Sequence, residues 1–291
     1  MSNKTETGAL PFLLMMNRMA WRNLFRRKRR TFITTFSVAF GIMLAVTFTG
    51  MGDYSYTDMI DTSAAMGLGH ITVEPKGYNY SPTLDKRLAN ADGLRQNALQ
   101  NPEVEDAIVR IMGQAMFSSA SKSVGGIFLA VDPSQESPER NFFLRSIVEG
   151  SLFEGTKGRG ALIGAKLAQK LNLRIGKKLV YTVTDTSGEI VGEMARVVGI
   201  FKTNSNTADG SFVILPIDRV RATLNYGKTE ASIVAVFIDD QRRAERVRTN
   251  LEKAVGNPNV DVLGWKETQS SVAGLVAMDK SSNYFFQFFV G

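Results

Sequence analysis

Residues 31–52 read TFITTFSVAFGIMLAVTFTGMG, a stretch of 22 residues without a charge. A helix of this length, at about 1.5 Å per residue, crosses a hydrocarbon core of roughly 30 Å. A cleaved signal peptide differs, because its apolar region is about 7–15 residues long and is followed by a small-x-small cleavage site. The end of the stretch, TFTGMGDY, makes a poor cleavage site. The stretch therefore predicts a transmembrane helix that the protein retains.

The charges on either side of this stretch predict its orientation. Five basic residues at positions 26–30 precede it, and Asp53 and Asp58 follow it. Because basic flanks stay on the cytoplasmic side, we expect residues 1–30 in the cytoplasm and the chain after residue 52 outside. Residues 10–25 also place apolar side chains between arginines, which predicts a basic amphipathic helix at the cytoplasmic membrane surface. An ordinary stop-transfer flank is the alternative.

The formal net charge of +7 argues against nucleic-acid binding because of where it lies. Residues 1–30 hold eight basic residues and one acidic residue, and the rest of the chain is neutral with 27 of each sign. A nucleic-acid-binding domain spreads its basic residues over a folded face. The chain also has no cysteine and a single histidine, which excludes disulfides, thiolate chemistry and His-rich metal sites.

The predicted transmembrane helix carries two stripes whose members are four positions apart. The small stripe consists of Ser37, Gly41, Ala45 and Thr49, and the bulky stripe consists of Phe36, Phe40, Leu44 and Phe48. Small residues let another helix backbone approach closely, so we expect the small stripe to pack against a partner helix in the membrane. The alternative is chance, since small residues are common in membrane helices.

The region outside the membrane alternates between predicted strands and helices. Residues 53–66 continue the membrane helix as a stalk that ends near Gly67 and Gly69. Strands are predicted at 70–75, 104–120, 124–132, 161–164, 177–185, 189–201, 210–216, 231–239 and 260–265, and helices at 93–100, 165–173, 217–225 and 241–255. Asp92 is the expected N-cap of the first of these helices, and Gly176 is expected to close the second. Because several strands form hairpins, we expect an α+β fold with mixed sheets rather than a doubly wound parallel sheet.

The end of the chain is apolar again. A last helix is predicted from Lys266, and residues 284–290 read YFFQFFV, which is too short to span a bilayer. We therefore expect residues 266–291 to form a second stalk helix and the start of a second transmembrane helix. This pattern predicts that the chain is the N-terminal part of a longer protein.

The sequence offers little catalytic chemistry. Residues 222–229, ATLNYGKT, come closest to a phosphate-binding loop, but alanine replaces the first glycine and the segment follows a helix instead of a strand. We interpret its Gly227 as a helix C-cap. His70 has no second histidine or cysteine with which to bind a metal, so a structural role is expected. Paired acids such as Asp239 and Asp240 fit helix caps. We expect no catalytic, cofactor or metal residues, and no enzymatic activity.

Several sequence segments, taken together, resemble a known protein family. They are residues 20–44 (AWRNLFRRKRRTFITTFSVAFGIML), 69–78 (GHITVEPKGY), 161–183 (ALIGAKLAQKLNLRIGKKLVYTV), 197–201 (VVGIF), 212–220 (FVILPIDRV) and 264–265 (GW). In this order they resemble the FtsX/MacB/LolC-type ABC transporter permeases. The lipoprotein-releasing LolC and LolE permeases look most similar.

The resemblance implies a particular domain plan. It implies an inner-membrane protein with four transmembrane helices, whose two-lobed periplasmic domain lies between the first and the second. Residues 91–149 would form a sabre-like lobe, and residues 67–90 with 150–265 a porter-like lobe, so that residues 53–280 are periplasmic. In LolC the hairpin matching residues 177–201 carries an extended loop that recruits a periplasmic carrier. Here that loop, Thr184 to Glu193, is short and has no proline, which speaks against recruitment of a carrier.

The resemblance also implies partners and a substrate class. A separate cytoplasmic ATPase would bind ATP, a second permease subunit would complete the transporter, and a lipoprotein or other amphiphile would be taken from the outer leaflet. The uncharged membrane helix agrees with an amphiphilic substrate, since ion pathways usually need ionisable groups. We expect Met43, Val46, Phe48 and Met51 to contact acyl chains, with membrane lipid or helix packing as the alternative. Two other functions stay open, a membrane-anchored sensor domain and an FtsX-like regulator of a cell-wall hydrolase.

Overall fold

A computed structural model describes residues 15–16, 18–19, 22 and 27–278 of the chain. The chain divides into two compact units, one ending at Ser55 and the other beginning at Tyr56. Most of the predicted amphipathic segment lies outside the described residues. The predicted start of a second transmembrane helix, at residues 284–290, also lies outside them.

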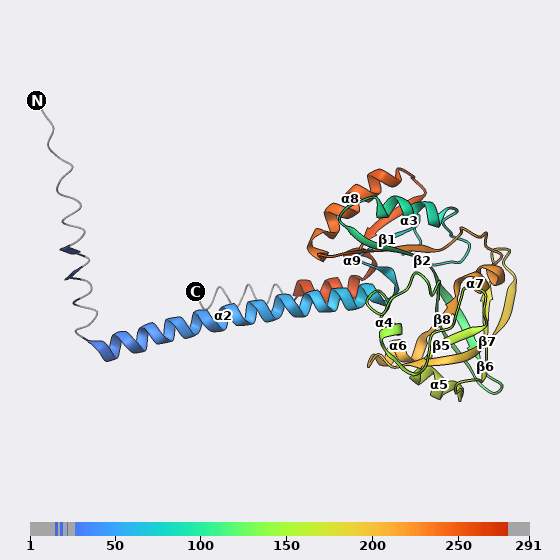
Figure 1. The fold of residues 1–291 in the computed structure, drawn as a ribbon, viewed down its shortest axis with the longest axis horizontal. Coiled ribbons are helices and arrows are strands. Elements are labelled where there is room, and N and C mark those ends of the chain that lie inside the picture. Colours follow the sequence, from blue (N-terminus) through green and yellow to red (C-terminus); the bar gives the residue numbers. More distant parts are fainter. Residues whose placement is uncertain (1–14, 17, 20–21, 23–26, 279–291) are drawn as a thin grey trace, which may run out of the picture. The chain divides into compact units, whose positions relative to one another are not determined.

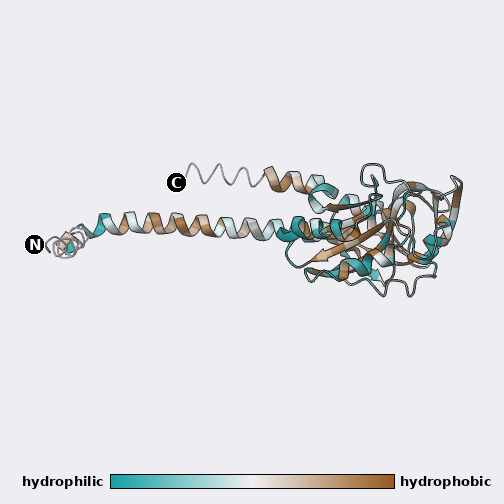
Figure 2. Cartoon of the chain, turned by 90° about the horizontal axis from the view of Figure 1, so that it is seen from above, coloured by the Kyte–Doolittle hydropathy of each residue, from teal (hydrophilic) through white to brown (hydrophobic). Residues whose placement is uncertain are grey.

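The membrane stretch forms a single helix, α2, from Lys28 to Ser63. Together with the residues up to Leu68, it is long and apolar enough to cross a membrane, and no residue of its most apolar stretch is buried. Figure 2 shows hydrophobic residues along much of this helix. Its hydroxyl groups bond to carbonyl oxygens of the preceding turn, namely Thr34 to Arg30, Ser37 to Ile33, Thr47 to Met43 and Thr49 to Ala45. These bonds satisfy polar groups that a bilayer could not solvate.

The second unit contains a split βαβ sheet in the order β10-β1-β9-β2. Its strands are β1 (Ile71–Pro75), β9 (Ile233–Ile238), β10 (Val260–Gly264) and the first part of β2 (Val104–Ser118), and all of the pairs are antiparallel. The helices α3 (Ala91–Leu99) and α8 (Ala244–Val255) lie together over this sheet (Figure 1). The chain order β1-α3-β2 and β9-α8-β10 is that of a ferredoxin-like fold.

The chain between β2 and β9 forms a second layer of strands. They are β3 (Ser123–Val131), β4 (Ile147–Gly150), β5 (Gly160–Gly164), β6 (Lys178–Thr184), β7 (Ile190–Phe201) and β8 (Phe212–Pro216). The pairs β3–β8 and β5–β7 are parallel and the others are antiparallel. Because β6 pairs with both β7 and β2, the path β2-β3-β8-β5-β7-β6 closes into a barrel. The expected α+β fold with mixed sheets is confirmed.

The strand pairing divides the domain differently from the expected lobes. Residues 104–110 of β2 pair with β9, and residues 111–118 pair with β3. The boundary therefore passes through β2 and not through residue 91 or 150. Helix α3 lies over the sheet that contains β1, whereas the strands within residues 160–216 are part of the barrel that contains β3. The predicted division followed chain order, and chain order does not show that one long strand serves two sheets.

Most predicted elements are present, but several local details were wrong. The N-cap of α3 is Asn90, whose side chain accepts the N–H of Gly93, and not Asp92. Helix α5 (Ala165–Leu171) is closed by Asn172 in the left-handed region, and not by Gly176. The short helices α4 (Phe142–Arg145) and α6 (Asn206–Ser211) and strand β4 were not predicted. Elements of four to six residues carry too few residues for a clear period, so the sequence does not reveal them.

The remaining helices agree better with expectation. Helix α7 runs over Ile217–Leu224, and α8 follows a 3₁₀ turn over Gln241–Arg243 that Asp240 caps. Gly256 ends α8 in the left-handed region. The predicted last helix is interrupted, because α9 (Trp265–Thr268) ends before Gln269 and a new helical stretch covers residues 270–278.

Candidate functional site

The small stripe of the membrane helix lies on an open surface of the described chain. The hydroxyls of Ser37 and Thr49 are engaged within the helix. A Cβ atom added at Gly41 would meet no atom within 4 Å apart from the neighbouring backbone of its own helix. The stripe can therefore offer close packing rather than hydrogen bonds to another helix. Its packing partner stays a prediction.

The four residues expected to contact acyl chains are all exposed, with Met43 at 54%, Val46 at 67%, Phe48 at 66% and Met51 at 70%. They do not share one face. At roughly 100° per residue, Phe48 points about 140° away from Met43. A single groove could not contact all four, and their role stays a prediction.

The stalk meets the sheet at a tight joint that contains two glycines. Helix α2 passes into a π-helical turn, η1 (Ala64–Leu68), in which Gly67 has φ 142°. Gly69 follows with φ 75°, and a Cβ on it would lie 2.7 Å from the Val236 carbonyl oxygen of β9. Only glycine fits either conformation without strain. The predicted end of the stalk near Gly67 and Gly69 is confirmed.

His70 ties the end of the stalk to the sheet. Its side chain is buried, and its Nε2 lies 2.9 Å from Asp61 Oδ1 on the last turns of α2. The Ile238 N–H of β9 donates to its Nδ1 at 3.2 Å. Because Nδ1 accepts, the proton sits on Nε2, which donates to Asp61. The expected structural role of His70 agrees with these contacts.

The helix that leaves the sheet is bonded at the same place as the helix that enters it. The Trp265 N–H donates to the His70 carbonyl oxygen at 2.9 Å, and the Gln269 Nε2 donates to the Gly69 carbonyl oxygen at 3.3 Å. Beyond the joint, Ile60 of α2 and Val276 of the helical stretch are both buried in the same hydrophobic cluster. Helical residues 270–278 lie beside the end of α2 (Figures 1 and 2). Residues 69 and 70 are therefore bonded both to the helix that enters the sheet and to the segment that leaves it.

Sequence reasoning did not find this joint. The segment GLGH indicated only a helix end and a strand start, and nothing near it identified Trp265 or Gln269 as partners. The useful signal was the single histidine directly after the segment Gly67-Leu68-Gly69, because a buried histidine needs hydrogen-bond partners.

A second buried acid, Glu74, lies further along β1. Its side chain is 1% exposed, and the Asn79 N–H donates to its Oε1 at 2.7 Å. In the strand register it lies opposite Asp261 of β10. Burial, assisted by the Asp261 carboxylate and opposed by the Asn79 N–H and the Lys86 ammonium, raises the pKa of Glu74 from 4.5 to about 7.

The stability of the domain should therefore fall as pH rises from about 4.5 to about 7. In this interval the folded state keeps the Glu74 proton that the unfolded state has released, so a rise in pH favours unfolding. At 1.36 kcal/mol per pKa unit the shift corresponds to about 3 kcal/mol. Thermal unfolding of the chain in detergent, followed by circular dichroism between pH 5 and 8, measures the slope. Glu74→Gln keeps an oxygen for Asn79 and should flatten it, and an unchanged slope in this variant would contradict the assignment.

The described residues bring together no set of three or more His, Cys, Asp or Glu side chains that could hold a metal ion. The segment at residues 222–229 contains the end of α7, where Asn225 adopts the left-handed conformation. The predicted cap at Gly227 is therefore wrong, although the segment is a helix end as expected. A shallow groove of about 580 Å³ on the barrel is lined in part by Met116, Ile127 and Ile190. Its side chains can contact an apolar group but supply no acid–base pair.

A membrane-length helix joins a ferredoxin-like sheet, and a second helix leaves the sheet at the same joint, which is the arrangement of a membrane-anchored domain. The chain matches the family model of the MacB-like periplasmic core domain over residues 31–254, and it belongs to this family. It is thereby a MacB/FtsX-type ABC transporter permease component. Members of this family work with cytoplasmic ATPase subunits.

Solved structures of low sequence identity are also similar. The periplasmic region of MacB from Actinobacillus actinomycetemcomitans is 11% identical, with a TM-score of 0.47, over 72% of this chain and 94% of that one. The extracellular domain of the ABC-type transporter YknZ from Gram-positive bacteria is 12% identical, with a TM-score of 0.46, over 67% and 99%. A domain of a putative permease protein from Porphyromonas gingivalis is 16% identical, with a TM-score of 0.37, over 68% and 88%. Among curated proteins, none matches the chain.

Proposed function

We propose that this chain is the permease subunit of an inner-membrane ABC transporter, with a cytoplasmic N-terminus and residues 53–280 in the periplasm. The observation that carries the proposal is the joint at Gly69 and His70, where the entering helix and the leaving helix are bonded to the sheet within two residues. A movement that begins at the membrane end of either helix would reach the periplasmic sheet through this joint. Family membership adds an ATPase as the source of that movement.

The substrate proposed is an amphiphile, and specifically a lipoprotein released from the outer leaflet of the inner membrane. The uncharged span of α2 supports this choice, since an ion pathway would need ionisable groups. A second permease subunit would face the small stripe, and ATP would be bound by the separate ATPase. This chain would bind no nucleotide and catalyse no reaction.

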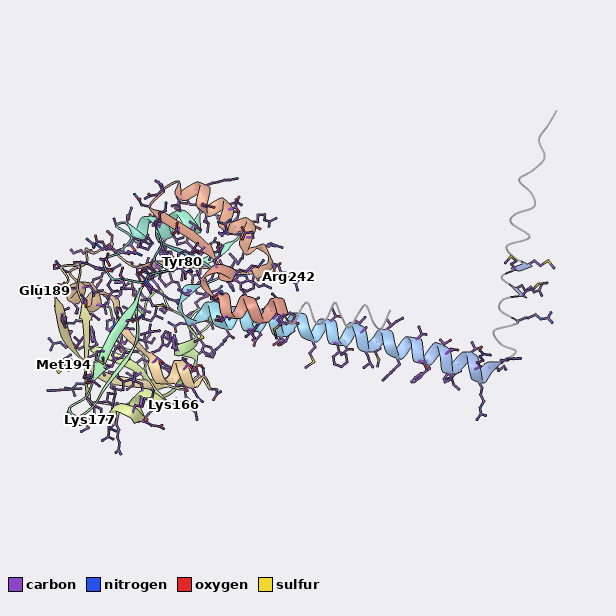
Figure 3. The ribbon with its side chains drawn as sticks, turned by 180° about the vertical axis from the view of Figure 1, so that it is seen from behind. Tyr80, Lys166, Lys177, Glu189, Met194 and Arg242 are labelled. Carbon is purple, nitrogen blue, oxygen red and sulfur yellow. The ribbon has the colours of Figure 1, made fainter. Side chains whose placement is uncertain are left out.

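The orientation can be tested with single cysteines, because the chain has none of its own. Ser187→Cys lies in the exposed turn of the β6–β7 hairpin, and Figure 3 labels Glu189 of the same turn and Met194 further along β7. In spheroplasts, a membrane-impermeant maleimide should label Ser187→Cys at once and Ser2→Cys only after the membrane is permeabilised. Labelling in the reverse order would overturn the proposed topology.

The two alternative functions, a sensor and an FtsX-like regulator, predict different partners for this chain. A sensor would need no ATPase and would pass its signal to a cytoplasmic signalling domain. An FtsX-like regulator would have the ATPase but would retain a cell-wall hydrolase on its periplasmic domain. Crosslinking of the periplasmic domain in intact cells would therefore recover an acylated lipoprotein if the proposed substrate is right, and a hydrolase if it is wrong.

A further inference from the structure

A buried arginine stands where the two sheets of the domain meet. Arg110 is the last residue of β2 that pairs with β9, and Ile111 is the first that pairs with β3. The side chain of Arg110 is 0% exposed, and so is that of its partner Glu136. The pair therefore lies at the boundary between the ferredoxin-like sheet and the barrel.

The guanidinium of Arg110 bonds to two segments of the chain, the loop of residues 136–141 and the η1 turn. Its Nε and Nη2 donate to the two carboxylate oxygens of Glu136, both at 2.7 Å. Its Nη1 donates to the Gly67 carbonyl oxygen in η1 at 2.8 Å, and its Nη2 also donates to the Arg140 carbonyl oxygen at 2.9 Å. The end of the stalk and the loop before α4 are thus held by one planar group, and a lysine could not reproduce this geometry.

The contacts continue from Glu136 into the barrel. The Asn141 Nδ2 donates to Glu136 Oε2 at 3.0 Å, and the Asn141 Oδ1 caps α4 by accepting the N–H of Phe143 at 3.1 Å. The Phe143 ring lies 4.9 Å from Phe201 of β7 and 4.9 Å from Phe212 of β8, measured between centroids. An unbroken series of bonds and ring contacts therefore runs from η1 to the hydrophobic cluster in which α4 packs against strands of the barrel.

We propose that Arg110 is a positioning residue that couples the end of the stalk helix to α4 and the barrel. A buried ion pair of this kind adds little net stability over an apolar pair of similar volume, so its value lies in the geometry that it enforces. Its effect is to make η1 and the loop of residues 136–141 move together. The biological role of this coupling rests on the proposed transport function, whereas the coupling itself is a property of the folded domain.

Hydrogen exchange of the full chain in detergent micelles measures the coupling without ATPase or cargo. Ala65→Gly loosens η1 without adding a clash, and it should raise exchange within η1 about fivefold, as expected for glycine in place of alanine in a helix. In the otherwise unchanged chain, the amides of Phe143 and Leu144 should also exchange several-fold faster. In the double variant Arg110→Met with Glu136→Leu, adding Ala65→Gly should change the exchange rates of these two amides by less than about twofold. Equal responses in the two backgrounds, or no response at α4 in the first, would overturn the proposal.

Three controls keep the result interpretable. Exchange in α8, which lies outside the proposed route, should stay constant in every variant that folds. Arg110→Lys keeps the buried charge beside Glu136 and provides a second background. In it the increase in amide exchange at α4 should be at least about twofold smaller, because lysine lacks the planar, bidentate geometry of the guanidinium. Arg140→Met removes another guanidinium over the same Phe237 ring and keeps the main-chain bond to Arg110, so it should leave the coupling intact. Retained coupling in both Arg110 backgrounds would assign the route to packing by Met66 of η1 instead.

Discussion

Glu136→Leu should lower the free energy of unfolding of the periplasmic domain by about 3–5 kcal/mol, because it leaves the Arg110 guanidinium buried without its counter-ion. Both side chains of the pair are fully buried, so no water can replace the lost carboxylate. The two remaining acceptors, the Gly67 and Arg140 carbonyl oxygens, are neutral. Chemical unfolding of the chain in detergent, followed by circular dichroism, measures the loss.

Two variants serve as controls for this prediction. Arg110→Met combined with Glu136→Leu replaces the pair by apolar groups and should lie within about 1 kcal/mol of the parent or above it. Glu105→Gln removes the acid from the partly exposed pair with Arg140 and should cost less than about 1 kcal/mol. A loss for Glu136→Leu no larger than that for Glu105→Gln would contradict the electrostatic account of the pair.

Gly41→Leu should reduce recovery of the second permease subunit with this chain by about tenfold or more. Apart from the neighbouring backbone of its own helix, nothing in the described chain lies within 4 Å of a Cβ at this position, so the chain alone has room for the new side chain. Leucine is also a better helix former than glycine. A loss of assembly would therefore come from a partner helix packed against Ser37, Gly41, Ala45 and Thr49.

Phe40→Leu is the matched control for that substitution. It changes the neighbouring bulky stripe, keeps an apolar side chain and should have a mild effect. The measurement is the yield of partner subunits that co-purify with each tagged variant from membranes. If Gly41→Leu assembles as well as Phe40→Leu does, the small stripe has no tight partner at Gly41.

The elements with a strong local period were predictable from the sequence. The membrane helix follows from an uncharged stretch of sufficient length, and strands such as β1, β7 and β9 follow from apolar runs between turn residues. Asp240 and Gly256 were predictable as caps because capping chemistry is local.

The arrangement of these elements was not predictable in the same way. Strand β2 gives a single pattern over 15 residues, yet it changes partner between Arg110 and Ile111. The bonds at the joint connect residues such as Gly69 and Gln269, which are 200 positions apart. A single sequence contains no record of such pairs.

One signal in the sequence could have identified the buried ion pair. Arg110 is the only charged residue in the run AIVRIM, residues 107–112, whose neighbours on both sides are apolar. A strand that is buried on both faces leaves no exposed position for such a residue, so it must have an acidic partner. The sequence does not show that the partner is Glu136, because the loop that carries it has several acids.

The central claim is that this chain works as the permease subunit of an ABC transporter. The measurement that tests it most directly is mass spectrometry of the complex isolated in mild detergent through this protein, expressed at its native level. We expect stoichiometric recovery of an ATPase subunit with a GxxxxGK[ST] phosphate-binding loop, together with a second permease subunit. Recovery of the protein without any such ATPase would contradict the account.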